Sequence, residues 1–510
     1  MTSSTDLPDD IDALKALLAA AEAQISAQNA TLTERDGIIE RKEDRIIRLE
    51  KLLADFKRAL YGAKSEKGHP DQYHLALEDI ETAMAVVHAE DEAIDPPKTA
   101  GATKSSKGRG VLPKHLPRVE EVIAPDSTTC GCGTERHIIG EDVSERLDIV
   151  PAQFRVIVTR RPKYACRSCE AGIVQAPAKS RLIEGGMPTE ATIASVIVSK
   201  YADHLPLYRQ SQIYARQGVD IDRSTLAFWV GKATHELRPV HDELLAHLKR
   251  STKLFMDETP APVLDPGRGK TKKGYFWALA RDDRGWNGPE PPGVAFTYTP
   301  GRSGQHAVDI LQGFEGILQV DGYAGYNRVL DLRDNAPIQL AYCWAHARRK
   351  LYELTHHNVA PVAEEGLKQI AALYRIEAQV RGQSAEDRLA MRLQKSAPRV
   401  ATFKIWLDHA RTQVSAKSPT GLALKYIAKY WDGLILFLTD GRIEMDSNAV
   451  ERTIRPIALQ RKNALFAGHD AGAQNWAMLA SLIETCKLNK IEPHSYLTGV
   501  LTAIVNGHKQ

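Results

Sequence analysis

Two aspartates each follow a short apolar run that predicts a buried β-strand. Asp257 comes after KLFM, and Asp321 comes after GILQV and opens the motif DGYAGYN. Strand ends bring side chains to one edge of a sheet, and the glycines after Asp321 permit a tight turn there. Carboxylates are preferred Mg²⁺ ligands, and two such ions about 3.5–4 Å apart support in-line displacement at a phosphodiester. The two aspartates are therefore candidate ligands for divalent cations.

A third carboxylate for such a site has to come from a distant part of the chain. The segment DSNAVERTIRP begins with residues that favour a helix N-cap, and Glu451 falls on the early turns of the predicted helix. Asp446 is a local rival, because it lies in the same motif, although it would equally cap the helix. Glu258 is a second rival, but it would point to the opposite face of the strand from Asp257. Spacing alone leaves this choice open.

Four of the six cysteines form two close pairs, CGCG and CRSC. Zinc takes four thiolate or imidazole ligands in a tetrahedron, and two paired turns supply such a set. The predicted ligands are Cys130, Cys132, Cys166 and Cys169, with His137 as the alternative to one of the first pair. Four protein ligands leave no open position, so the zinc would be structural. The competing interpretation is that these are small buried residues of a β-rich unit.

The first segment, residues 9–62, contains no proline and carries an apolar heptad row. The row consists of Leu18, Ile25, Leu32, Ile39, Ile46, Leu53 and Leu60. This spacing predicts a coiled coil through which two copies associate. A companion row is apolar at its ends and polar in the middle, at Gln28, Arg35 and Lys42. A long amphipathic helix folded back on its own chain is the alternative.

Composition describes a multidomain protein of ordinary polarity. The chain has 510 residues and a net charge of only +3, from 67 basic and 64 acidic residues, so its total charge does not announce a nucleic-acid partner. The acidic N-terminus and the lack of a long apolar run predict neither a secretory signal nor a membrane span. We expect a cytoplasmic, nucleoid-associated protein in which Cys343 and Cys486 are core residues.

The remaining segments follow from turn and periodicity signals. Residues 91–118, rich in Pro, Gly, Ser and Lys, are predicted to be a basic linker, either a solvated tether or a contact to phosphates. Residues 119–182, with segments such as FRVIVTRR, are expected to form the small zinc-binding β unit. Residues 252–475 alternate strands and helices, with a helical block at about 338–440, and residues 476–510 are expected to form a C-terminal helical region.

Residues 188–250 are predicted to be helical and include a possible helix-turn-helix. Gly218 suits the turn, and Asp222 or Ser224 suits the N-cap of the second helix. Three residues would lie at the start of that helix, where recognition helices meet DNA: Arg223, Ser224 and Thr225. Two packed helices without a role in DNA binding are equally compatible with the pattern.

Nearly the whole chain resembles the transposases of the bacterial insertion sequence sixty-six family. The motifs that carry the resemblance are YGAKSEK, RPKYACRSC, HLPLYRQ, MDETP, GKTKKGYFWALARDD, VDGYAGYN, CWAHARRK, EMDSNAVERTIRP and RKNALFAGHDAG. Two details depart from the family pattern: CxC stands where CxxC is common in the first zinc half, and DSN stands where DNN is common before the third acid.

The resemblance implies a multidomain α/β protein of the Asp-Asp-Glu type. It has a leucine-zipper-like N-terminus, a small zinc-binding domain, a helical DNA-binding part and a ribonuclease-H-like catalytic domain. The block at 338–440 would be a helical insertion in that catalytic domain. By resemblance the first, second and third acids are Asp257, Asp321 and Glu451.

Basic residues near these motifs are candidate DNA contacts. They are His346, Arg348, Arg349 and Lys350 in CWAHARRK, Arg452 and Arg455 beside Glu451, and Arg461 and Lys462. A solvated basic helix face is the competing interpretation for such clusters.

These observations lead to one hypothesis about function. The chain binds the terminal inverted repeats of a mobile element as a homodimer or larger oligomer, with two Mg²⁺ or Mn²⁺ ions, structural zinc, double-stranded DNA and possible small accessory proteins as its partners. It then cleaves the element end and joins the 3′-hydroxyl to target DNA. The alternatives are a non-catalytic, repressor-like DNA-binding protein and a nuclease without transfer activity.

Overall fold

The computed structural model describes residues 10–61, 118, 152–164, 174–265, 270–331, 338–355, 360–464 and 467–507. The chain divides into two compact units, residues 1–150 and 151–510. The predicted zinc ligands and almost all of the predicted linker 91–118 lie outside the described residues. Within the described part, no helix combines the length and the apolar content needed to cross a membrane.

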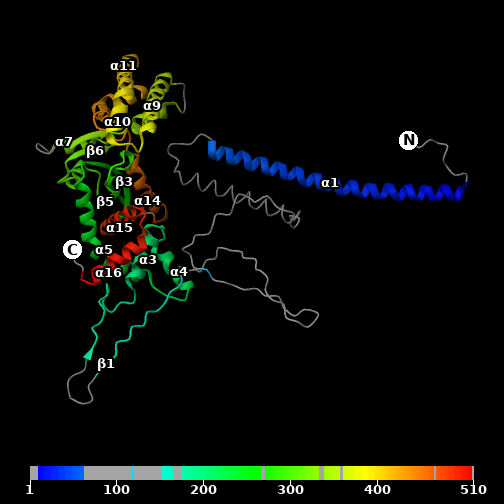
Figure 1. Ribbon diagram of the computed structural model, residues 1–510, viewed down its shortest axis with the longest axis horizontal. Coiled ribbons are helices and arrows are strands. Elements are labelled where there is room, and N and C mark those ends of the chain that lie inside the picture. Colours follow the sequence, from blue (N-terminus) through cyan, green and yellow to red (C-terminus); the bar gives the residue numbers. More distant parts are fainter. Residues whose placement is uncertain are drawn as a thin grey trace, which may run out of the picture. The chain divides into compact units, whose positions relative to one another are not determined.

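The described part of the first unit is essentially one helix, α1, spanning Ile11–Tyr61 (Figure 1). The heptad row predicted from the sequence lies along it. The side chains of this row that the structure describes are 52–62% exposed: Leu18, Ile25, Leu32, Ile39 and Ile46. Burial of such a row is the main source of stability of a helix pair, so this helix presents a seam of the kind that a second helix covers.

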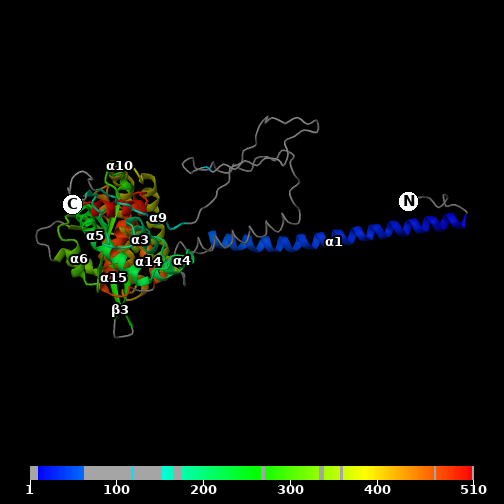
Figure 2. The same cartoon turned by 90° about the horizontal axis from the view of Figure 1, so that it is seen from below.

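The second unit is built on a five-stranded mixed sheet in the order β5-β4-β3-β6-β7. The strands are β3 (Lys253–Asp265), β4 (Lys270–Arg281), β5 (Gly293–Thr299), β6 (Gly316–Val320) and β7 (Ile338–Tyr342). β3, β4 and β5 are antiparallel neighbours, whereas β3, β6 and β7 run parallel. The outer half of the β3–β4 hairpin reaches beyond the rest of the sheet (Figure 2).

Helices from both ends of the unit cover one face of this sheet. The helices in contact with the strands are α5 (Arg223–Lys249), α14 (Asn448–Ala464) and α15 (Asp470–Leu488), and α3 (Glu190–Tyr201), α4 (Leu207–Arg216) and α16 (Pro493–Val505) pack on the helices of this group. Their apolar side chains join Phe255, Phe276 and Phe296 of the sheet in one buried cluster. Burial of each large side chain contributes roughly 1.5–3 kcal/mol, so this cluster holds the N- and C-terminal helices to the sheet.

The opposite face packs on short elements between the strands: α6 (Gly304–Ile310), η2 (Ala324–Tyr326) and α7 (Asn327–Asp331). The short helix η1 (Arg284–Trp286) follows β4 and has no buried residue. A third cluster forms the core of a helical block at one end of the sheet (Figure 1). Its elements are α8 (Trp344–Thr355), α9 (Pro361–Val380), α10 (Ala385–Met391), the π-helical turn η3 (Arg392–Ser396), α11 (Ala397–Gln413), α12 (Pro419–Lys429), α13 (Trp431–Leu434) and η4 (Leu436–Leu438).

Two element boundaries and one expected strand differ from the sequence predictions. The helical block begins at α8 rather than at about 338, because residues 338–342 are strand β7, paired in parallel with β6. The helix α15 crosses the predicted boundary at 475–476, since its residues 477–483 are buried beside β5. The segment 154–161 is not a strand. In the described part of 119–182, the only strands are the two-residue pair β1 (Lys163–Tyr164) and β2 (Val174–Gln175).

The predicted helix-turn-helix has the expected backbone. Gly218 adopts φ +79° in the turn between α4 and α5, a conformation that favours glycine. Asp222 is the N-cap of α5, and its Oδ1 accepts the backbone N–H of Ser224 at 2.7 Å. The inner face of α5 is buried in the main core, so only the outer side of this helix is available to a partner.

Candidate active site

Asp257 and Asp321 both follow the paired part of two neighbouring parallel strands. β3 and β6 pair as far as Phe255 opposite Gln319, and each aspartate lies two residues further along its chain, close enough for the charge of Asp321 to raise the pKa of Asp257. Neighbouring strands are about 4.8 Å apart, so the two carboxyl groups share one edge. The sequence predicted that Asp257 ends its strand, but the strand continues past this residue. Asp257 lies where β3 leaves β6 and continues in the hairpin with β4.

The turn after Asp321 is held by tyrosines of the helical block. A carboxylate oxygen of Asp321 accepts the backbone N–H of Tyr323 at 2.8 Å, which closes the turn. Tyr430 Oη donates to the carbonyl of Gly322 at 2.7 Å. Tyr426 packs so closely on Gly322 that a Cβ at this position would collide with it. Glycine is therefore required here by close approach, and the helical block helps to fix the position of Asp321.

Glu451 approaches from the first turn of α14, on the side of the sheet that Asp257 faces. The buried face of α14 consists of Val450, Ile454 and Ile457, which belong to the same cluster as Phe255. Because Asp257 is two residues beyond Phe255, its side chain leaves the strand on that face. Packing of α14 on the sheet thus brings a helix-borne carboxylate to the side of the sheet that Asp257 faces, close enough for its charge to raise the pKa of Asp257.

The chain that leads into α14 is fastened directly to the strand that carries Asp321. The buried amide of Gln319 donates from Nε2 to the carbonyl of Glu444 at 2.8 Å, and its Oε1 accepts the backbone N–H of Glu444 at 2.9 Å. This pair of bonds joins a point two residues before Asp321 to a point seven residues before Glu451. It is one physical reason why acids 130 positions apart in the sequence converge.

The three acids repel one another in the absence of a cation. Burial raises the pKa of Asp257 well above its usual range, and the neighbouring charges of Glu258, Asp321 and Glu451 raise it further. The Oε1 atom of Glu451 is buried and has no hydrogen-bond partner among the described residues. Hard oxygen donors and an excess of negative charge fit divalent cations such as Mg²⁺. Asp257, Asp321 and Glu451 are the residues that would hold them.

Both rivals for the third acid are engaged elsewhere. Glu258 leaves β3 on the opposite face, where its Oε2 accepts the hydroxyl of Tyr326 at 2.6 Å and its Oε1 accepts the guanidinium of Arg302. Asp446 accepts the backbone N–H of Asn448 at 3.1 Å and thereby starts α14. These placements favour Glu451, for which the described residues provide neither a capping bond nor an ion pair with arginine.

Sequence reasoning missed a buried charge network beneath this site. Arg392 is fully buried and makes a two-pronged contact with Glu377 at 2.8 and 2.7 Å. Its Nη1 also donates to the backbone carbonyls of residues 437, 440 and 441. Arg388, 1% exposed, donates to Glu444 at 2.8 Å. No local pattern marks these arginines, because their helices carry many exposed charges of the same type.

Profiles of known families match the chain over most of its length. Residues 185–475 match the profile described as Transposase IS66 family, which is more than half of the sequence and includes all three acids. The chain belongs to the IS66 transposase family. Further matches cover the zinc-finger binding domain of transposase IS66 (residues 127–170), the Transposase C of IS166 homeodomain (48–120) and the IS66 C-terminal element (481–510).

Relatives of this IS66 family member share its full length. The uncharacterized protein y4qI of Sinorhizobium fredii (strain NBRC 101917 / NGR234) is 43% identical over 98% of this chain and 95% of its own. The uncharacterized protein y4jD of the same strain is 42% identical over 92% of this chain and 93% of its own. The Mos1 transposase paired-end complex with left transposon end overlaps 49% of this chain and 79% of its own at 12% identity. Its TM-score of 0.13 is too low to carry an argument.

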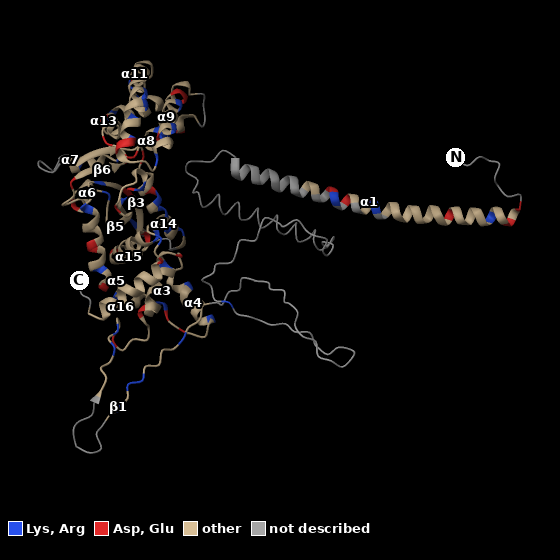
Figure 3. Ribbon diagram, in the orientation of Figure 1, with Lys and Arg blue, Asp and Glu red and all other residues tan. Residues whose placement is uncertain are grey.

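In this IS66 chain the predicted DNA contacts on α14 fall into two groups. Arg452, Arg455 and Lys462 are exposed on this helix. Figure 3 colours the basic residues of the ribbon blue, α14 included. Arg461 is half-buried, and its Nη1 donates to the carbonyl of Pro260 on β3. This contact ties the end of α14 to the hairpin, so Arg461 has a structural bond that the sequence did not predict.

The other predicted contacts are placed on two helices. On α8, Lys350 is exposed and Arg348 and Arg349 are half-buried, whereas His346 turns towards Glu451, with its Nδ1 at 3.8 Å from Glu451 Oε1. At the start of α5, Arg223 and Ser224 are exposed and Thr225 is partly buried. The predicted zinc ligands fall within residues 127–170, the range that the zinc-finger profile matches.

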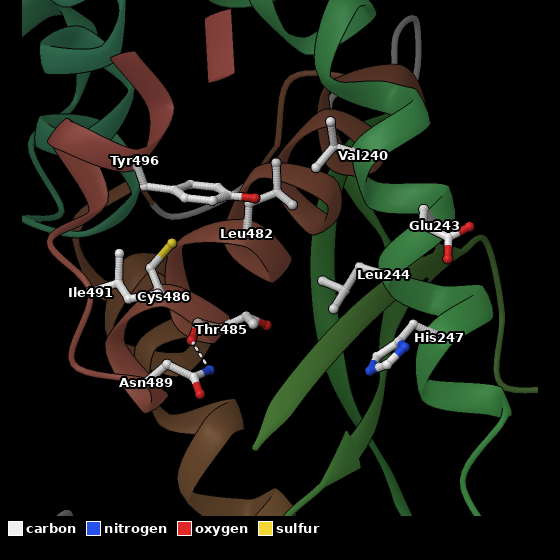
Figure 4. Close-up of a pocket in the computed structure, with 10 residues that line it drawn as sticks. All are labelled: Val240, Glu243, Leu244, His247, Leu482, Thr485, Cys486, Asn489, Ile491 and Tyr496. Atoms are coloured by element: carbon white, nitrogen blue, oxygen red, sulfur yellow. Dashed lines mark hydrogen bonds between the residues drawn. The ribbon is translucent and has the colours of Figure 1, made fainter. Parts of the chain in front are cut away.

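A separate cavity of about 330 Å³ lies between α5, α15 and α16. Its walls are mainly apolar, with Leu244, Leu482 and Tyr496 among the lining residues shown in Figure 4. The polar side chain of Asn489 is already bonded to the carbonyl of Thr485 at 2.8 Å. None of the three acids lines this cavity, so it is distinct from the candidate active site.

Proposed function

We propose that this member of the IS66 family is a DNA transposase that cleaves element ends and transfers them to target DNA. The proposal rests above all on one arrangement: Asp257 and Asp321 each lie two residues beyond the last paired residues of β3 and β6, and the charges of Asp321 and Glu451 both act on the carboxyl of Asp257. We further propose that the mixed sheet forms a ribonuclease-H-like catalytic domain interrupted by the helical block. Structural zinc at the cysteine pairs is a separate part of the proposal.

The proposed roles follow from the position of each residue. Two Mg²⁺ ions held by the three carboxylates would activate a water or 3′-hydroxyl nucleophile and stabilise the leaving oxygen. Asp257 and Asp321 offer oxygens from a rigid sheet edge, and Glu451 offers one from the packed helix α14. Preorganised ligands of this kind need little rearrangement during the reaction. The register between β3 and β6 sets the relative position of the first two ligands.

The proposed DNA contacts are the cations that the fold exposes near these acids. Arg455 lies one turn after Glu451 on α14, and Lys462 lies two turns further along nearly the same face of the helix. Arg452 lies beside them, and all three are exposed. Such a row can follow the phosphates of one DNA strand. We propose that Arg348, Arg349 and Lys350 act similarly, and that Arg223, Ser224 and Thr225 contribute to binding of the inverted repeats.

A cleavage assay with Glu451→Gln tests the proposed function. The substrate is a supercoiled plasmid that carries the DNA segments flanking this coding sequence, incubated with the full chain and Mg²⁺. We expect wild type to nick the plasmid and to form joined products, and Glu451→Gln to lose both activities while still binding the DNA. Nicking by the variant at the wild-type rate would contradict the triad. DNA binding without any cleavage by wild type would instead indicate a repressor, and nicks without joined products would indicate a nuclease.

We also propose that a second copy of the chain covers the exposed heptad row of α1. The variant Ile25→Lys/Leu32→Lys places charge on the row, whereas Ala23→Lys/Ala30→Lys adds the same charge elsewhere on the same two turns. All four residues are exposed within one chain. Light scattering after size exclusion should show a dimer or larger oligomer for wild type and for the alanine variant, and a smaller species for the first variant. Equal masses for all three proteins would exclude this helix as the contact.

A further inference from the structure

Two buried polar atoms face each other beside the candidate active site. The Nδ1 atom of His346 and the Oε1 atom of Glu451 are both buried, and within the part of the chain that the structure describes neither has a hydrogen-bond partner. They are 3.8 Å apart. A buried polar group without a partner is destabilising, so two complementary ones at this distance are an unfavourable arrangement unless they form a hydrogen bond with one another.

The backbone around these two residues holds their helices in a fixed relation. The N–H of Trp344, at the start of α8, donates to the carbonyl of Met445 at 2.9 Å. The N–H of Ser447, just before α14, donates to Cys343 Sγ at 3.3 Å. Trp344 itself is fully buried. The first turns of α8 and α14 are therefore joined at two points, and His346 and Glu451 lie one turn beyond those joints.

We propose that His346 is a positioning residue for Glu451, donating a hydrogen bond from Nδ1 to Glu451 Oε1. If the two side chains moved about 1 Å closer, the distance between Nδ1 and Oε1 would be that of an ordinary hydrogen bond. The inference depends on the proposed function, because it assigns Glu451 as a metal ligand. With one carboxylate oxygen held by the imidazole, the other stays aimed at the edge where Asp257 and Asp321 meet. Partners of this kind orient ligating carboxylates in metal sites generally.

This role differs from the DNA contact predicted from the sequence. His346 lies in a basic motif, but its side chain is only 20% exposed, and its ring nitrogen faces an acid rather than solvent. The cations that follow it, such as Lys350, are left to meet DNA. Cys343 completes the small cluster, with its Sγ within 4.8 Å of the ligand atoms of His346 and Glu451. Burial raises the pKa of this thiol to about 11, so it is neutral.

Three substitutions at His346 test the geometry. Asparagine places its amide nitrogen close to the position of Nδ1, glutamine places it close to Nε2, and alanine removes both. The readout is binding of Mn²⁺ to the zinc-loaded full chain without DNA, followed by electron paramagnetic resonance. We expect His346→Ala and His346→Gln to weaken Mn²⁺ binding roughly 10–100-fold, the usual effect of losing such a partner. His346→Asn should bind Mn²⁺ much as wild type does.

The controls separate this inference from the function on which it rests. Glu353→Gln, an exposed position on the same helix α8, should leave Mn²⁺ binding unchanged. Unchanged binding in His346→Ala, or equal losses in the alanine and asparagine variants, would overturn the positioning role. A coordinated imidazole nitrogen in the spin-echo spectrum of bound Mn²⁺ would overturn it too, because His346 would then be a ligand. Wild-type binding by Glu451→Gln would instead refute Glu451 as a ligand.

Discussion

Asp257→Asn is expected to abolish Mg²⁺-dependent DNA cleavage and, at the same time, to stabilise the metal-free protein at neutral pH. A carboxamide is a much weaker cation ligand than a carboxylate. Loss of one ligand should remove several kcal/mol of transition-state stabilisation, a factor on the order of 10³ in rate. The plasmid assay measures this loss. The neutral amide keeps the shape of the side chain, so binding of DNA should persist.

The gain in stability follows from the pKa of Asp257, which is raised by burial and then by the charges of Glu258 and Asp321. The folded chain keeps a proton on this carboxyl at pH values where the unfolded chain has lost it. Between the ordinary and the raised pKa the folded state therefore binds more protons, and stability falls as pH rises through that window. Asparagine has no such ionisation, so the variant avoids the loss.

Thermal melting in EDTA at pH 8 and pH 5 checks this sign. The variant should melt above wild type at pH 8, and the difference should shrink at pH 5. Addition of Mg²⁺ should raise the melting temperature of wild type more than that of the variant. Asp203→Asn, at an exposed position after α3, is the matched control and should change neither property. A variant that melts below wild type at pH 8 would contradict the crowding of negative charge at this edge.

The second large effect is expected far from any substrate, at Arg392. Arg392→Met should lower the free energy of unfolding by about 3 kcal/mol, because the buried carboxylate of Glu377 loses its two-pronged contact and keeps the longer ion pair with Arg388 at 3.6 Å. Three backbone carbonyls between residues 437 and 441 also lose a donor. These carbonyls belong to the chain that leads through Glu444 into α14, so the substitution should also loosen the approach of Glu451.

Scanning calorimetry of the full chain measures the effect as a lower melting temperature. Lys395→Met makes a similar change on the same π-helical turn, but at an exposed position where the amine donates to Gln379 Oε1 at 3.4 Å. The free energy of unfolding of that variant should stay within about 0.5 kcal/mol of the wild-type value, as is usual for surface substitutions. Equal stability of the two variants would show that the buried network adds little. The double variant Arg392→Met/Glu377→Leu should recover part of the loss, because no charge is then left unpaired.

Local patterns in the sequence were sufficient for elements whose signal is complete within a few residues. The apolar runs before Asp257 and Asp321 predicted β3 and β6, the heptad predicted α1, and Gly218 with Asp222 predicted the turn and cap before α5. Each of these depends on side-chain period or on the backbone conformation of single residues. For the same reason the sequence could indicate that carboxylates reach a sheet edge, but not which residue would be the third.

The tertiary structure decided the features that depend on contacts between residues distant in the sequence. The segment 338–342 is too short for its sequence pattern to predict a strand, and it forms β7 by pairing with β6. The choice of Glu451 over its two rivals depends on the contacts that the rivals make. Glu258 binds Arg302 and Tyr326, and Asp446 accepts the N–H of Asn448. His346 changes from a residue of a basic motif to the neighbour of Glu451 because α8 and α14 are joined at their first turns. The residue types and their spacing thus determined the chemistry available to this protein, whereas burial and packing between distant segments decided which of those groups meet.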